Sequence, residues 1–209
     1  MQVATEKKKI ESRAFKKSRS ANDSSPSPYR WTVDEYYRLD DLGFFVGKHV
    51  ELIRGEILEK PPMKSPHAAS VQLVSESLAK VFVKGFSIRQ QLPLAFSKLN
   101  EPLPDIAVVV GSIRDYAELH PKKAAMIVEV SDATLSFDRT KKASLYAEFG
   151  IEEYWVVNVR DRQVEVNRKP AKNSAKAFYY AEQTIYREDQ SVAPLAKPKS
   201  KIKVKDILP

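Results

Sequence analysis

Apolar residues along the chain repeat at two spacings, and the two spacings predict different elements. A spacing of three to four residues predicts helices, and the first begins after Thr32, which forms a capping box with Glu35. Two longer helices are expected over residues 67–82 and 138–149, and Gly150 stands where the second would end. Short runs rich in β-branched residues predict strands at residues 50–53, 56–58, 86–88, 92–94, 106–110, 126–130, 154–157, 163–166 and 178–186.

The order of these elements indicates the class of fold. Helix, hairpin, helix, strands, helix and strands follow one another, and no internal repeat is visible. We expect an α/β (α+β) fold in which one mixed sheet is flanked by helices, with an N-terminal helix and a hairpin that turns at residues 54–55. Residues 86–88 and 92–94 would form either one strand or a bent pair.

Composition sets the extent of the folded part. The 209 residues are 43% hydrophobic, enough for the core of one ordinary domain, which we place at residues 29–209. Residues 1–28 are rich in Lys, Ser and Pro, so we expect a disordered basic tail. The chain has no cysteine, which excludes disulfides and thiolate chemistry, and its three histidines are too scattered for a histidine-built zinc site. No apolar run approaches the roughly 18 residues of a membrane span, and we expect a cytoplasmic protein.

The net charge of +8 is unevenly distributed. Residues 1–30 carry +5, residues 168–209 carry +6, and the part between them carries −3. This excludes a uniformly basic protein that coats DNA. Near the C-terminus, five lysines alternate with other residues over 197–205, which predicts an extended strand with every lysine on one face. Such a strand would be either a solvated sheet edge or a surface that contacts phosphates.

Two carboxylates stand at unusual places in the predicted strands. Asp105 follows Pro104 directly before the run 106–110, and Glu129 lies inside the apolar run 126–130. A carboxylate in an apolar strand is costly unless it is paired or bound to a metal. If the two strands are neighbours, both side chains could meet at one edge of the sheet, where hard oxygen ligands suit Mg²⁺ or Mn²⁺. Taken singly, Asp105 could instead belong to a turn, and Glu129 could face solvent or pair with a lysine.

The predicted helix that follows Glu129 carries three polar residues on one face. Asp138, Lys142 and Tyr146 recur at intervals of four residues, so their side chains lie above one another. This helix could fold back over the end of the Glu129 strand. Alone, the same pattern is also typical of an Asp–Lys pair on a solvated face.

Together these residues resemble the PD-(D/E)XK nuclease superfamily and, more closely, the Uma-type family of endonucleases with a restriction-endonuclease-like fold. The resemblance covers residues 29–209 and rests on the order and spacing of several short motifs. These are Trp31–Tyr36, Val50–Glu56, Ser65-Pro66-His67, Pro104-Asp105, Val128–Ser131, the spaced residues Asp138, Lys142 and Tyr146, and Glu153-Tyr154-Trp155.

The resemblance implies a role for individual residues. Asp105 and Glu129 fall on the metal-binding acids of the superfamily. Ser131 stands where its lysine is usually found, and the resemblance places that lysine on the following helix at Lys142, with Lys141 a poorer match. Lys142 would then steady the attacking nucleophile or the phosphorus.

The resemblance also implies an activity and partners. Glu51, His67 and Tyr146 would be neighbours of the site, and the protein would be a Mg²⁺- or Mn²⁺-dependent endonuclease that hydrolyses phosphodiester bonds in DNA. A homodimer would supply the two sites that double-strand cleavage usually requires. The alternative is a catalytically silent nucleic-acid-binding or assembly module on the same fold. A carboxylate-based glycosidase is disfavoured by the lysine-rich ends and by the lack of aromatic residues near either acid.

Overall fold

The computed structural model describes residues 26–209. The predicted disordered tail, residues 1–28, therefore lies almost wholly outside the described residues. In the described part, no helix combines the length and the apolar character that a membrane crossing requires.

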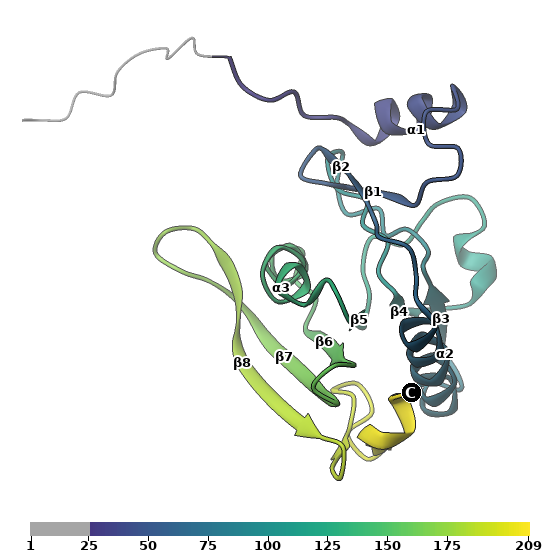
Figure 1. The fold of residues 1–209 in the computed structure, drawn as a ribbon, viewed down its shortest axis with the longest axis vertical. Coiled ribbons are helices and arrows are strands. Elements are labelled where there is room, and N and C mark those ends of the chain that lie inside the picture. Colours follow the sequence, from purple (N-terminus) through teal and green to yellow (C-terminus); the bar gives the residue numbers. More distant parts are fainter. Residues whose placement is uncertain (1–25) are drawn as a thin grey trace, which may run out of the picture.

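A six-stranded mixed sheet forms the centre of the fold (Figure 1). Its strands, in spatial order, are β3 (Phe86–Gln90), β4 (Ile106–Val110), β5 (Met126–Ser131), β6 (Glu153–Asn158), β7 (Gln163–Lys172) and β8 (Phe178–Arg187). The β5–β6 pair is parallel and all other neighbours are antiparallel. The predicted mixed sheet is therefore confirmed, although β7 is longer than the sequence pattern indicated.

The segment 92–94 is not a strand, so both the single strand and the bent pair predicted there are wrong. Gln91 adopts a left-handed conformation with φ of 50°, which turns the chain out of the sheet after β3. Pro93 lacks the amide hydrogen that a strand would need for pairing. Residues 91–105 instead form a long connection to β4.

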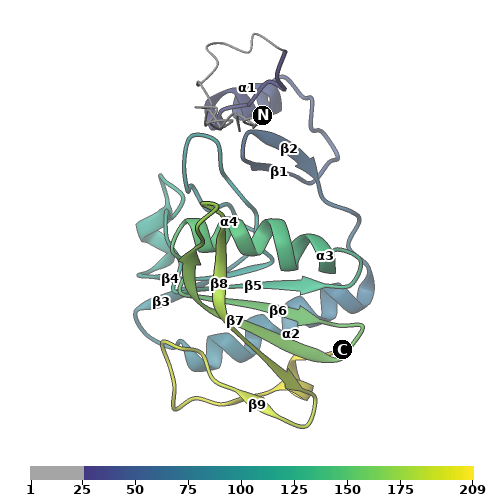
Figure 2. The same ribbon diagram turned by 90° about the vertical axis from the view of Figure 1, so that its left-hand side faces the viewer.

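Helices cover both faces of the sheet (Figure 2). The helix α2 (Ser65–Val81) lies on one face, where Val74 and Leu78 belong to the same hydrophobic core as Val108 of β4. The other face is covered by a continuous helical segment, whose Leu145 belongs to a second core together with Ala107 of β4. That segment consists of α3 (Leu135–Phe137), a π-helical turn (Asp138–Lys142) and α4 (Ala143–Glu148). Alternate residues of β4 therefore face opposite layers, and Asp105 continues the Ala107 face.

The N-terminal part confirms the predicted capping box and hairpin. Helix α1 (Val33–Asp41) begins after Thr32, whose Oγ1 accepts a hydrogen bond from the Glu35 amide. The hairpin of β1 (Val50–Ile53) and β2 (Glu56–Glu59) turns through Arg54 and Gly55, which have φ of 53° and 73° as a type I′ turn requires.

The hairpin is fixed to the long connection that precedes β4. Leu52 and Glu101 exchange two backbone hydrogen bonds, of 3.3 and 2.8 Å. This contact carries the hairpin side chains toward the beginning of β4, and it is the basis of the site described below.

The predicted C-terminal lysine strand is wrong. Only β10 (Ile202–Lys203) is extended, paired with β9 (Ser191–Val192), and a 3₁₀ helix follows over Val204–Ile207. Burial of Ile202, Val204 and Ile207 in the core beneath α2 sets the path of the chain, because these side chains gain more than an exposed lysine does. Another 3₁₀ helix, Ile113–Tyr116, lies between β4 and β5.

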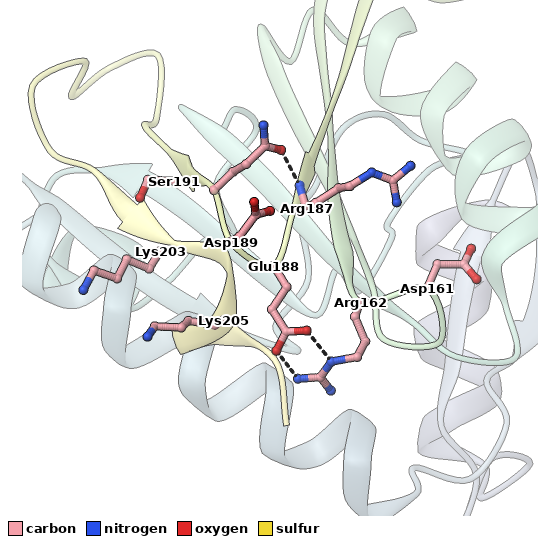
Figure 3. Close-up of a pocket in the computed structure, with 9 residues that line it drawn as sticks. Asp161, Arg162, Arg187, Glu188, Asp189, Ser191, Lys203 and Lys205 are labelled. Carbon is pink, nitrogen blue, oxygen red and sulfur yellow. Dashed lines mark hydrogen bonds and ion pairs between the residues drawn. The ribbon is translucent and has the colours of Figure 1, made fainter.

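Two of these lysines line an open cleft of about 830 Å³ (Figure 3). The cleft also holds an ion pair between Arg162 and Glu188, with Nε and Oε2 2.8 Å apart, and the carboxylates Asp161 and Asp189. Because three acidic residues line the cleft together with Lys203 and Lys205, the surface is of mixed charge rather than a row of lysines.

Candidate active site

Asp105 and Glu129 lie side by side on neighbouring strands. Strand β4 pairs with β5 so that Ile106 is opposite Val128, which brings Asp105 next to Glu129 on the same face of the sheet. The Asp105 amide donates to Glu129 Oε2 at 3.2 Å, and the Val130 amide donates to Asp105 Oδ2 at 2.9 Å. Each residue is 2% exposed. The sequence expectation that both carboxylates meet at one end of the sheet therefore describes their observed placement.

The helical segment over β5 adds a lysine and a tyrosine to this pair. Lys142 Nζ donates to Glu129 Oε1 at 3.0 Å and to Glu51 Oε2 at 2.8 Å. The Tyr146 hydroxyl also donates to Glu129 Oε1, at 2.5 Å. Asp138, the third residue on that helix face, instead accepts hydrogen bonds from Ser131 and Thr134. The four-residue spacing thus brings Lys142 and Tyr146 onto Glu129.

Two basic residues contact Asp105 directly. Lys60, directly after β2, places Nζ 3.2 Å from Asp105 Oδ1 and 3.0 Å from the carbonyl oxygen of Leu103. His67, in the first turn of α2, places Nε2 3.4 Å from Asp105 Oδ2. The family resemblance implied His67 as a neighbour of the site, but nothing in the sequence indicated Lys60, whose approach depends on the long-range packing of the hairpin.

One residue, Leu103, connects the hairpin to the acidic pair. The Leu103 amide donates to Glu51 Oε2 at 3.0 Å, while its carbonyl accepts the hydrogen bond from Lys60. Glu51 and Lys60 therefore hold the two ends of the same residue, two positions before Asp105. All of the site residues predicted from the sequence are in this cluster.

The charges perturb one another strongly. Burial raises the pKa of Glu129 to about 7, and the charge of Asp105 adds to the shift against the opposing effect of Lys142. For Asp105, burial opposes ionisation, but the hydrogen bond from His67 and the charge of Lys60 lower the pKa below its ordinary value. The pKa of Asp105 is therefore the lower of the two, and Asp105 is the more readily ionised member of the pair.

The pKa values of the two basic groups Lys142 and His67 are both raised. Burial disfavours the charged form of Lys142, yet Glu129 and Glu51 outweigh it and raise its pKa above the ordinary value. Burial likewise opposes protonation of His67, but the hydrogen bond to Asp105 raises its pKa. Charged lysines consequently stand on both sides of the two carboxylates.

These groups line a cavity of about 590 Å³. Its walls include apolar side chains from the segment after β2 and from α3, among them Met63 and Phe137. The mouth of the cavity carries further polar residues, including Lys64 and Asp132. The chain thus offers a partly enclosed space at the end of the sheet in which acidic and basic groups converge.

The donor set fits a divalent ion with hard-ligand preference. Asp105 and Glu129 supply carboxylate oxygens, and each such oxygen has more than one acceptor position. Within residues 26–209, no group of three or more His, Cys, Asp or Glu residues is arranged to hold a metal. Mg²⁺ needs only one or two carboxylates because it retains several waters, so the pair is sufficient for it.

The chain is similar to known proteins both in sequence and in fold. The family model Uma2, described as "Putative restriction endonuclease", matches residues 33–200. Among solved structures, the crystal structure of a "putative nuclease belonging to DUF820" from Anabaena variabilis ATCC 29413 is similar, with a TM-score of 0.66. It shares 19% sequence identity and covers 84% of this chain and 96% of its own, which shows a common fold. No curated protein matches the chain.

Proposed function

The chain belongs to the Uma2 family of restriction-endonuclease-like proteins, and we propose that it is a Mg²⁺- or Mn²⁺-dependent endonuclease that hydrolyses phosphodiester bonds in DNA. The observation that carries this proposal is the pair Asp105 and Glu129, buried together on adjacent strands and lining one cavity with Lys60 and Lys142. Such convergence of perturbed titratable groups in a cleft is typical of a catalytic centre.

In this proposal each side chain of the site has a separate role. Asp105 and Glu129 would hold the ion, which when bound polarises a phosphoryl oxygen and lowers the pKa of the attacking water. Lys142 and Tyr146 fix the Glu129 carboxylate, because both donate to its Oε1. His67 orients Asp105 from the first turn of α2. The apolar wall around Phe137 restricts water, which strengthens the electrostatic interactions inside. The active form would be a homodimer, which supplies one site for each strand of the duplex.

The test is an incubation of supercoiled plasmid with Mg²⁺ or Mn²⁺, in parallel with calorimetric titration of each metal. The wild-type protein should nick or linearise the plasmid, and Asp105→Asn should abolish cleavage because it removes an ionised metal ligand. Asp132→Asn is the matched control, since Asp132 lines the same cavity but its carboxylate lies beside Arg160, at 3.9 Å. Intact plasmid despite measured metal binding would support the silent binding module instead.

A further inference from the structure

The two lysines of the site differ in how far a substrate could reach them. The Lys142 side chain is 2% exposed, and its ammonium is held between the carboxylates of Glu51 and Glu129. The Lys60 side chain is 25% exposed and lies toward the mouth of the cavity, beside His67 at 19%. A phosphate entering the cavity would meet Lys60 without disturbing the fold, whereas contact with Lys142 would require breaking two buried ion pairs.

The contacts of the two lysines support the same distinction. Lys142 is shared by two carboxylates, so its charge is fully used inside the protein. Lys60 contacts one carboxylate oxygen, Asp105 Oδ1, and one neutral carbonyl. Asp105 is also the proposed metal ligand, so an ion that binds there competes with the Lys60 ammonium for the same oxygen.

The backbone keeps the displaced ammonium close to the site. The Lys60 amide donates to the His49 carbonyl at 2.7 Å, and Pro61 and Pro62 follow directly. A lysine side chain has a flexible four-carbon stem and three donors on a compact charge, which suits a phosphate oxygen. The group released from Asp105 would therefore remain at the cavity mouth with its charge uncompensated.

We propose that Lys60, rather than Lys142, is the lysine that contacts the phosphate of the substrate, and that it pairs with Asp105 until a metal ion takes its place. This inference rests on the proposed nuclease function. Lys142 then serves to neutralise Glu51 and Glu129. The site thus has one lysine for the fold and one for the substrate, drawn from different parts of the chain.

The experiment compares Lys60→Gln with Lys64→Gln, which removes the same charge from another exposed lysine of the same cavity. Mn²⁺ affinity is measured by calorimetry, inorganic phosphate affinity in saturating Mg²⁺, and plasmid cleavage in parallel. Lys60→Gln should bind Mn²⁺ more tightly, because a competing cation is gone, and phosphate about tenfold more weakly, because a charge-assisted hydrogen bond is lost. Cleavage should fall with phosphate affinity, and Lys64→Gln should behave as wild type.

Lys60→Arg provides the second variant, since it retains the charge and should keep phosphate affinity within a few-fold of wild type. Thermal melting of all variants checks that the fold is intact. Unchanged phosphate affinity and cleavage in Lys60→Gln would overturn the role of Lys60 while leaving the nuclease proposal standing. A wild-type protein that neither binds Mn²⁺ nor cleaves plasmid would overturn both. Equal losses in Lys60→Gln and Lys64→Gln would reduce the effect to general cavity charge and also reject the assignment.

Discussion

Replacing Lys142 by methionine removes the cation between two buried carboxylates while keeping the volume of the side chain. Glu51 and Glu129 both lose their ion-pair partner, at 2.8 and 3.0 Å, in a region closed to solvent. Removing one partner of a buried pair costs about 3–5 kcal/mol of unfolding free energy. For a folded part of this size that corresponds to a fall in melting temperature of about 10 °C.

The loss of unfolding free energy in Lys142→Met should grow as the pH rises. The pKa of Glu129 in the folded wild type is already raised to about 7 from the ordinary 4.5, and without Lys142 it would rise further. A carboxyl group whose pKa is higher in the folded state than in the unfolded state keeps its proton in the folded state at pH values where the unfolded chain has released it. Its contribution to the unfolding free energy is therefore complete below the unfolded pKa, and it is lost as the pH rises through the folded pKa. The neighbouring charge of Asp105 acts in the same direction, while Lys60 partly offsets it.

Urea unfolding followed by circular dichroism, at about pH 5.5 and about pH 8 without divalent ions, measures this effect. Lys141→Met is the control, because Lys141 is the adjacent residue in the same helical segment but is exposed. Its unfolding free energy should change by less than about 0.5 kcal/mol at either pH. An equal loss in both variants, or a loss in Lys142→Met that does not depend on pH, would refute the reasoning.

Two further predictions follow from single contacts. Glu129→Gln should lower Mn²⁺ affinity in calorimetry by at least about tenfold and abolish plasmid cleavage, because the neutral amide is a much weaker ligand for a hard cation; unchanged affinity would remove Glu129 from the metal site. Thr32→Ala should cost about 1 kcal/mol, seen as a fall of a few degrees in melting temperature, because the Glu35 amide loses its acceptor; an unaltered melting temperature would show that the start of α1 does not contribute to the cooperative unfolding of the domain.

The parts of the site that could be predicted from the sequence are those set by local periodicity. Asp105 and Glu129 adjoin or interrupt apolar runs whose β-branched residues favour central strands, and the spacing of Lys142 and Tyr146 fixes one helix face. The π-helical turn did not disturb this, since both side chains remain buried against Glu129. The mixed sheet follows from the same runs.

The parts of the site that could not be predicted depend on contacts between segments that are distant in the sequence. Lys60 reaches Asp105 across 45 residues of sequence, through a hairpin whose position is set by its pairing with Glu101. No local pattern reports such a contact. The prediction of an extended C-terminal lysine strand was wrong for a related reason. The alternation of the lysines was visible in the sequence, whereas the burial of Val204 and Ile207 under α2 was not.

Leu103 ties the hairpin to the segment that leads into Asp105. Its amide donates to Glu51, its carbonyl accepts from Lys60, and it lies between Pro102 and Pro104. The two prolines narrow the backbone conformations available on either side of it. A shift of the hairpin as a unit relative to β4 would therefore act on two contacts of the same residue. The position of the lysine that faces the cavity and the position of the carboxylate that anchors Lys142 are thus coupled through one residue of the connection.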